Sequence, residues 1–316
     1  MMKTGAFIIP TGIGASIGGF AGDAGKFVRR LSKKCKLIVN PNVVNAACFS
    51  AITDNMLYVE GYTLDRFFRG EIGLKESIDN KIGVIFDKAI PQDVLNIHIN
   101  TINAVKTVYG IDIYGYELTS DEVGVEFFID KSGVSTGNVK NLDTIKNAAE
   151  KLINCGCNSV AIVCLFPEEQ GDDYANGIGV DPVGGVEAII SHYISKELNI
   201  PCAHAPAFFS TEISSEVVDP RCSAEYITPT FLPCILIGLA NAPQIVKKTE
   251  GINIQNLDFL IVPYNSLGGI PVLEMNKLGK KIYVISENKT VLDVDPVHFP
   301  VKCDTISTYE DLMELV

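Results

Sequence analysis

The sequence contains few basic residues and no basic tract. Lysine and arginine together number 26, against 38 aspartates and glutamates, which gives a formal net charge of −12. Proteins that bind the phosphate backbone of nucleic acids need clustered lysine and arginine side chains. We therefore expect no nucleic-acid partner.

Long hydrophobic runs are also absent. The apolar N-terminal segment 6–10 is too short for a signal peptide or a membrane span. The most apolar later segment, 231–242, is short as well and is interrupted by Pro233. We therefore expect no membrane partner.

The nine cysteines form no CxxC pair. Their odd number and apolar surroundings are typical of reduced thiols, so we expect a cytoplasmic protein. The single Cys155-Gly-Cys157 step has no second half, which argues against a structural zinc knuckle. GxSxG, HExxH, EF-hand and Cys/His finger motifs are missing too, which weakens the standard hydrolase and zinc-protease interpretations.

The sequence does contain enough apolar surface for a large core. Hydrophobic residues make up 47% and charged residues 20% of the 316 positions, as in globular proteins. The length suits two domains or one large α/β unit. Short apolar runs bounded by Gly, Pro, Asn or Asp predict strands that are covered on both faces. These runs are 6–10, 36–39, 56–59, 82–86, 111–118, 123–129, 159–166, 200–204, 259–262 and 281–286.

Helix-like spacing of apolar residues lies between the predicted strands. The predicted helices are Leu142–Asn154, Val186–Leu198, Val272–Leu278 and Thr308–Leu315. Repeated strand–helix alternation predicts a mainly parallel, three-layer α/β sandwich of Rossmann-like type. Region 111–139 departs from this pattern and predicts an antiparallel β insertion or edge hairpin. We place a boundary after it, which divides the chain into lobes 1–140 and 141–316.

Six glycines lie between residues 12 and 25, after a predicted strand and before a helix-like segment. Glycine lets the backbone approach a ligand closely, and a helix N-terminus offers N–H groups to an anion. Thr11, Gly12 and Gly14 are therefore candidate substrate-binding residues. The G-x-G-x-x-x-G spacing also allows a nicotinamide nucleotide, although the next strand ends at Asn40 and not at an acidic residue. Glycines that serve only turns and packing are the remaining interpretation.

Polar side chains follow the second and third predicted strands. Asn40 and Asn42 lie where sheets of this kind bind ligands, beyond the carboxyl ends of the strands. An Asx-turn that starts a helix is the alternative for these two residues. Glu60 occupies a position suited to a general base, and Arg66 supplies positive charge nearby. Surface ion pairing is the alternative for this second segment.

Asp181, Gly184 and Gly185 open a predicted helix. Asp181 can cap this helix and the glycines free its first N–H groups, so all three are candidate ligand-binding residues. Cys202 and His204 follow, and they share one face of a strand because they are two residues apart. A neighbouring histidine can stabilise a thiolate, so we predict nucleophilic or acid–base catalysis by this pair. Metal ligation and a buried structural pair are the alternatives.

Six segments stand out together: Pro10-Thr-Gly-Ile-Gly14, Asn40-Pro-Asn42, Val59-Glu-Gly-Tyr62, Val180-Asp-Pro-Val-Gly-Gly185, Pro201-Cys-Ala-His-Ala-Pro206 and Thr230-Phe-Leu-Pro-Cys234. They resemble an uncharacterised "domain of unknown function" family of about this length in bacteria and some eukaryotes. The resemblance covers nearly the whole chain and implies a complete protein, but it implies no activity and no catalytic residues. The Asn-rich second loop and Asn154-Cys-Gly-Cys157 also resemble aspartate/glutamate-racemase-type enzymes, whose paired catalytic cysteine motifs are not matched.

These observations predict a small-molecule enzyme that acts on an anionic metabolite, with hydrolase or isomerase as the favoured class. Cys202, His204 and Glu60 would supply acid–base or nucleophilic chemistry. Arg221, at a loop–helix junction, would bind a carboxylate or phosphate through its planar guanidinium, with a Glu225 ion pair as the alternative. The sequence names no cofactor.

Two other functions remain open at this point. One is a nucleotide-dependent transferase or oxidoreductase that uses the glycine loop 12–18. The other is a non-enzymatic ligand-binding or assembly protein in which the apolar segment 231–246 is a subunit interface. The second alternative makes a homo-oligomer one expectation for this chain.

Overall fold

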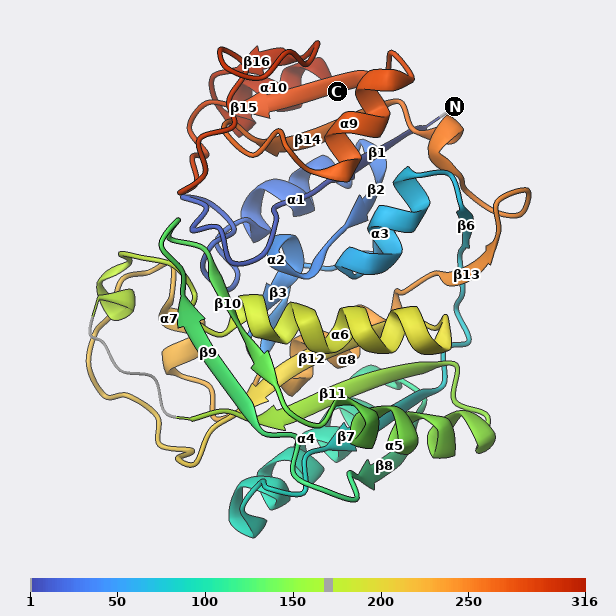
Figure 1. The fold of residues 1–316 in the computed structure, drawn as a ribbon, viewed down its shortest axis with the longest axis vertical. Helices are drawn as coiled ribbons and strands as arrows, with labels where there is room; N and C mark the ends of the chain where they lie inside the picture. The colour runs from blue at the N-terminus through green and yellow to red at the C-terminus, as the bar shows by residue number, and fades with distance from the viewer. Residues whose placement is uncertain (1, 168–172) are drawn as a thin grey trace.

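The computed structural model describes residues 2–167 and 173–316. A six-stranded parallel sheet forms one half of the molecule, at the top of Figure 1, in the order β5-β2-β1-β14-β15-β16. Its strands are Lys3–Phe7 (β1), Cys35–Val39 (β2), Met56–Tyr58 (β5), Phe259–Pro263 (β14), Lys281–Ile285 (β15) and Asp304–Ile306 (β16). The helices of this half are Gly25–Leu31 (α1), Pro41–Val44 (α2), Gly61–Phe68 (α3), Ile270–Lys277 (α9) and Tyr309–Leu315 (α10).

A four-stranded parallel sheet forms the other half, in the order β12-β11-β7-β8. Its strands are Ile82–Phe86 (β7), Ile113–Leu118 (β8), Ser159–Leu165 (β11) and Cys202–Ala207 (β12). Its helices are Gln92–Tyr109 (α4), Leu142–Asn154 (α5), Gly184–Leu198 (α6), Ser223–Tyr226 (α7) and Leu232–Ala240 (α8). Every residue of β7 and β14 is buried, as expected for strands that are covered on both faces.

The chain crosses between the two halves twice, on strands that lie side by side. It leaves the six-stranded half through β6 (Ile72–Lys75) and returns through β13 (Gln244–Lys247), and these strands pair antiparallel (Figure 1). Each sheet therefore contains strands from both sides of residue 140. The predicted lobes 1–140 and 141–316 do not coincide with the two sheets, because β1 pairs with a strand more than 250 residues away.

The mainly parallel α/β organisation is confirmed, but the predicted antiparallel insertion has different bounds. Strand β8 belongs to the four-stranded sheet and pairs parallel with β7. The antiparallel hairpin consists of β9 (Val125–Ile129) and β10 (Ser135–Val139). Its turn is held by Asp130, whose carboxylate accepts hydrogen bonds from the Ser132 N–H and hydroxyl. A small third pair joins β3 (Asn45–Ala46) and β4 (Phe49–Ser50).

The apolar segment predicted as a subunit interface lies inside the molecule. Seven of the nine residues of α8 are buried, and the helix packs against α4 and strands β11 and β12. Its side chains belong to a core cluster that contains strand residues from both sheets. The prediction of a subunit interface at 231–246 is therefore wrong for α8, because the apolar side chains of this helix pack in the core between the two halves.

Candidate functional site

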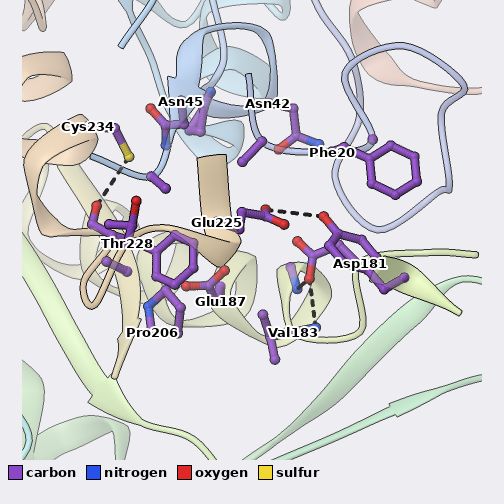
Figure 2. A pocket seen from close by; sticks show the side chains of 18 of the residues that line it. Phe20, Asn42, Asn45, Asp181, Val183, Glu187, Pro206, Glu225, Thr228 and Cys234 are labelled. Carbon is purple, nitrogen blue, oxygen red and sulfur yellow. Dashed lines mark hydrogen bonds between the residues drawn. The ribbon is translucent and has the colours of Figure 1, made fainter. Parts of the chain in front are cut away.

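A cleft of about 530 Å³ lies between the carboxyl ends of β1 and β2 and the carboxyl end of β12 (Figure 2). This is the edge at which parallel α/β sheets bind ligands, and the volume is within the range of small-molecule sites, about 300–1,000 Å³. We call segments 10–21 and 41–47 the N-terminal wall. We call Tyr174 with segments 180–187, 204–214 and 225–235 the C-terminal wall.

The predicted site residues divide between lining and non-lining positions. Those that line the cleft are Thr11, Gly12, Gly14, Asn42, Asp181, Gly184 and His204. Those outside the lining are Asn40, Glu60, Arg66, Gly185, Cys202 and Arg221. The cleft is thus lined by residues of the two predicted glycine loops and by His204. The two arginines and the other two predicted catalytic residues, Glu60 and Cys202, lie outside the lining.

Polar groups of the N-terminal wall bond mostly to one another. The Thr11 hydroxyl donates to Asn42 Oδ1 at 3.2 Å. The Asn40 side chain accepts from the Ile9 N–H and donates to the Ile9 carbonyl, so it joins the ends of β1 and β2. Gly12 has a φ of 73° and its carbonyl accepts from Ser135 N, which fixes this wall against the β9–β10 hairpin. These contacts give the wall its shape.

The N–H groups at positions 16–18 of the glycine loop already have acceptors within the chain. The Ser16 N–H donates to Lys289 O, the Ile17 N–H to Asn288 Oδ1, and the Gly18 N–H to Asp23 Oδ1. Helix α1 starts only at Gly25 and its N-cap, Ala24, has no side-chain acceptor. The segment therefore differs from a dinucleotide loop, in which glycine N–H groups at a helix start face the phosphates.

The first turn of α6 is capped by the chain itself. Asp181 Oδ1 accepts from the Val183 and Gly184 N–H groups at 3.0 and 3.2 Å, and Figure 2 shows Asp181 beside Val183. The Gly185 N–H donates to Ser135 Oγ at 2.9 Å. The prediction that these N–H groups are free for an anion is therefore wrong. Burial raises the pKa of Asp181, although both hydrogen bonds oppose that shift.

Glu187 and His204 form the central pair of the C-terminal wall. Glu187 is buried on the first turns of α6, and its Oε2 lies 4.0 Å from His204 Nε2 on β12. His204 Nδ1 is 2.8 Å from the Ser191 hydroxyl. Burial, with a smaller contribution from the charge of His192, lowers the pKa of His204 to about 3. His204 is therefore a neutral imidazole at physiological pH.

Aromatic and sulfur groups complete the C-terminal wall. The Tyr174 hydroxyl donates to Glu225 Oε1 at 3.2 Å, and the Tyr174 ring lies 4.9 Å from the Phe20 ring of the opposite wall. Cys234 lines the cleft, its thiol donates to Phe231 O, and burial raises its pKa to about 12. This thiol is therefore protonated at neutral pH and is a poor nucleophile.

Cys202 shares a strand face with His204, as its spacing predicts, but it does not reach the cleft. Its side chain contacts Ser195 Oγ at 3.1 Å and donates to Ser191 O at 3.0 Å, so both β12 residues bond to α6. Cys202 is 1% exposed and burial raises its pKa well above the usual value. A buried, protonated thiol does not suit the predicted nucleophile.

Glu60 and Arg66 serve α3 and its surroundings. Glu60 is 3% exposed and caps α3, since its carboxylate accepts from the Tyr62 and Thr63 N–H groups. Its Oε2 lies 3.9 Å from His192 Nε2, on the face where α3 meets α6. Arg66 donates to Asn199 Oδ1 at 2.6 Å and pairs with Glu71 at 3.5 Å. Both side chains thus have structural partners.

Arg221 is held by its own loop. Its guanidinium donates to both carboxylate oxygens of Asp219 and to the Gly177 carbonyl, and it lies 4.8 Å from the Phe20 ring centre. The alternative prediction paired Arg221 with Glu225, but Asp219 is its ion-pair partner and Glu225 accepts from Tyr174. The guanidinium of Arg221 packs against the Phe20 ring, and Arg221 does not line the cleft.

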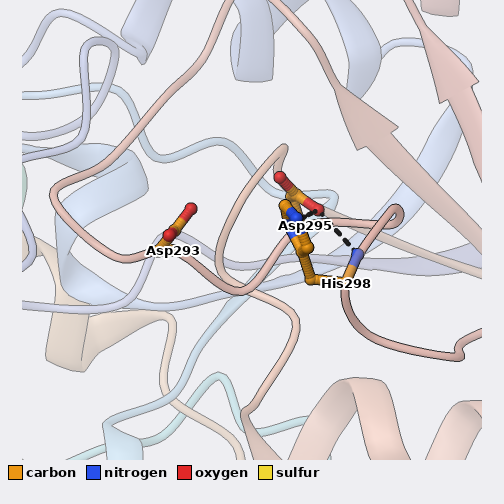
Figure 3. Close-up of side chains that lie close together, drawn as sticks. All are labelled: Asp293, Asp295 and His298. Carbon is orange, nitrogen blue, oxygen red and sulfur yellow. Dashed lines mark hydrogen bonds and ion pairs between the residues drawn. The ribbon is translucent and has the colours of Figure 1, made fainter.

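One group of side chains in the described part of the chain has the spacing of a metal site. Ligand atoms of Asp293, Asp295 and His298 lie within 4.8 Å of one another (Figure 3). Asp295 Oδ1 already accepts from the Val297 N–H, the His298 N–H and His298 Nδ1, which explains the cluster as a capped turn. Asp293 and His298 are exposed, so nothing here requires a metal ion.

Several lining residues were not predicted from the sequence. Glu187 follows the glycines of α6 within Gly-Val-Glu-Ala-Ile-Ile, and an acidic residue inside that apolar run was the available signal. Phe208 lies in an irregular segment, Tyr174 in a short 3-10 helix and Glu225 in the short helix α7, and none of these segments has a motif. Their position at the cleft follows from the return of the chain toward β1 and β2.

Nearly the whole chain is similar to other known proteins. Residues 4–316 match the family described as "Protein of unknown function (DUF3326)". A protein named "Uncharacterized lipoprotein" from Synechococcus sp. (strain ATCC 27144 / PCC 6301 / SAUG 1402/1) is 36% identical over 315 residues, which cover 97% of this chain and 88% of the relative. No solved structure matches. Within the described residues, no helix has the length and apolar character needed to cross a membrane. The chain belongs to the DUF3326 family of proteins of unknown function.

Proposed function

We propose that the cleft is the active site of an enzyme that abstracts and returns a proton on a small polar molecule. The supporting observation is the Glu187–His204 pair, with Oε2 and Nε2 4.0 Å apart in a cleft of about 530 Å³. Two groups capable of proton transfer or hydrogen bonding, side by side at the carboxyl end of strands, are typical of acid–base sites.

Glu187 acts as the general base in this proposal and His204 as a neutral hydrogen-bond donor. The Ser191 hydroxyl is nearer to His204 Nδ1, at 2.8 Å, than to its two carbonyl acceptors at 3.3 and 3.5 Å. We propose that the Ser191 hydroxyl donates to Nδ1, an arrangement in which the neutral imidazole carries its proton on Nε2, facing Glu187. The low pKa of His204 keeps the imidazole neutral.

The proton balance of the step is simple. Glu187 takes a proton from a carbon next to a carbonyl group, and His204 Nε2–H donates to the carbonyl oxygen on which negative charge develops. Return of the proton to the same or a neighbouring carbon completes an isomerisation. The same pair can activate a water molecule, which keeps a hydrolase as the second reaction class.

Other predicted properties remain part of the proposal. The order β5-β2-β1-β14-β15-β16 corresponds to 3-2-1-4-5-6 in chain order within the sheet, which supports a Rossmann-like, three-layer description. All nine cysteines are free thiols, which supports a reducing, cytoplasmic location. Arg66 and Arg221, which were expected to bind an anionic metabolite, bind other groups and lie outside the cleft lining.

Solvent-exchange measurements test the proposed function. The purified chain is incubated in D2O with a panel of hydroxy acids, amino acids, amino amides, keto acids and sugars, and loss of carbon-bound hydrogen is followed by NMR. We expect exchange with at least one class, and a loss of about 100-fold or more in Glu187→Gln, the usual contribution of a general base.

A matched variant controls for charge and for helix stability. Glu197→Gln makes the same change on α6, where Glu197 pairs with Lys146 on the surface, and should exchange like the unmodified chain. Exchange that is unaffected by Glu187→Gln, or no exchange with the whole panel, would count against the proposal.

A further inference from the structure

The charged groups that line the cleft all have one sign. Asp181, Glu187, Glu212 and Glu225 line it, and the described lining contains neither lysine nor arginine. Arg221 is bound to Asp219 and lies outside the lining. We infer that the substrate carries a protonated amino group, which the carboxylates of the C-terminal wall bind. This inference rests on the proposed function of the cleft as the active site.

Asp181 is the carboxylate best placed for this role. Its Oδ1 is used by the Val183 and Gly184 N–H groups, whereas its Oδ2 has no hydrogen bond within the described residues. Burial raises the pKa of the group, because it disfavours the ionised form. A bound ammonium group would supply both the missing donor and the missing positive charge.

Aromatic rings line the same cleft as these carboxylates. Phe20 and Tyr174 face each other at 4.9 Å, and Phe208 and Phe231 pair at 6.4 Å. All four residues line the cleft. Ring faces attract ammonium groups, especially where water is partly excluded. Carboxylates combined with ring faces therefore favour an amine over a sugar, a hydroxy acid or a phosphate.

The spacing of the acidic groups favours an organic cation over a metal ion. A metal ion needs three or more ligand atoms around one point, and among described residues that spacing occurs only at Asp293, Asp295 and His298. The cleft residues do not form such a group. Dispersed carboxylates in a cleft of about 530 Å³ suit a molecule of several atoms whose amino group takes one position.

Binding of three four-carbon probes tests the inference without any need for turnover. The probes are 1,4-diaminobutane, 1,4-butanediol and succinate, which differ mainly in charge. The chain contains no tryptophan, so Phe208→Trp places a single fluorescent indole at the cleft. Calorimetry on the unmodified chain provides the second measurement. We expect the diamine to bind at least tenfold more tightly than either other probe.

Two variants that change only charge distinguish diamine binding in the cleft from general attraction of a cation to an acidic protein. Asp181→Asn keeps the helix cap and removes the charge, and it should weaken diamine binding at least tenfold. Glu197→Gln also removes one negative charge, on the outer surface of the same helix, and should change binding less than twofold. The inference is overturned if the diol or succinate binds as tightly as the diamine, if no probe binds, or if both variants behave alike.

The exchange and binding experiments fail in different ways. If diamine binding depends on Asp181 but no panel member exchanges hydrogen, the amine site is supported and the proposed proton transfer is overturned. Exchange that depends on Glu187, with no preference for the diamine, would retain the chemistry and overturn the amine inference.

Discussion

The two walls of the cleft come from different sheets and differ in chemistry. The N-terminal wall consists largely of glycine, asparagine and small apolar residues, whose polar groups bond to one another or to neighbouring loops. Among the described residues, the C-terminal wall carries four carboxylates, the neutral His204 and most of the aromatic rings. One wall thus supplies shape, and the other supplies charge and proton-transfer groups.

This difference shows that a glycine-rich loop after the first strand is no guide to the reactive groups. The loop approaches the cleft closely, but its free N–H groups are few because Asp23 and Asn288 accept from them. The reactive groups lie on α6 and β12, which meet through Ser191. The contrast predicts that substitutions of the acid–base side chains on the C-terminal wall lower activity, whereas substitutions on the N-terminal wall and at the contact between α6 and β10 lower stability.

The largest effect is expected at His204. His204→Ala removes the donor for the developing oxyanion and should lower the exchange rate about 100-fold, the usual loss for one such donor. His204→Gln keeps an N–H group and should recover about tenfold of that loss. Exchange kinetics by NMR give both values. Equal rates in the two variants would indicate a structural role for the imidazole.

The next effect is on stability, where α6 packs against β10. An alanine Cβ at position 185 would lie 1.9 Å from the Ser135 carbonyl oxygen, so backbone must move. We expect Gly185→Ala to lower the free energy of unfolding by about 2 kcal/mol, as overpacking does. Denaturant unfolding measures the change. Gly269→Ala, whose nearest neighbour is 3.6 Å away, should cost far less; equal losses would contradict the packing argument.

A smaller, pH-dependent effect is expected behind the N-terminal wall. Burial raises the pKa of Asp23 from 3.8 to about 7, and its Oδ2 has no hydrogen-bond partner within the described residues. The folded state therefore holds this proton up to higher pH than the unfolded state does. The stability that comes from the protonated group is complete below pH 4 and is lost as pH rises to about 7.

Asp23→Asn cannot ionise and tests this dependence. It should raise the melting temperature by about 2–4 °C at pH 8, which corresponds to roughly 1 kcal/mol, and by almost nothing at pH 4. Asp54→Asn makes the same change at an exposed turn and should show no such dependence. A shift that is independent of pH would assign a normal pKa to Asp23.

The smallest effect on activity is expected at Cys202. Cys202→Ser keeps a hydrogen-bonding group toward Ser191 and Ser195 and lies outside the lining, so the exchange rate should change less than threefold. A loss of 100-fold or more would restore the thiol as the nucleophile and contradict the assignment of Cys202 to the core.

Local sequence patterns predicted much of the secondary structure. Helix α5 and strand β7 have the predicted bounds, Leu142–Asn154 and Ile82–Phe86, because apolar spacing and a following glycine or aspartate mark their ends. Strands β6 and β13 were not predicted, since they are short and each pairs with a strand that is distant in the sequence. Strand β10 was expected only as part of the β insertion 111–139, and it pairs with the neighbouring strand β9. The division of the chain between sheets likewise depends on the pairing of β1 with β14.

The candidate site was predicted only in part, for a related reason. His204 and the two glycine loops follow from residue type and position after a strand. Glu187 does not, because an acidic residue in an amphipathic helix is usually on the solvent face. Only the packing of α6 against β12 brings it within 4.0 Å of His204.

Paired exchange measurements on one variant from each wall test the central claim most directly. Glu187→Gln removes the base of the C-terminal wall, and Asn42→Ala removes a polar lining group of the N-terminal wall. The account predicts a loss of about 100-fold or more for Glu187→Gln, and a change within a few-fold for Asn42→Ala. A larger loss in Asn42→Ala than in Glu187→Gln would contradict the assignment of the chemistry to the C-terminal wall.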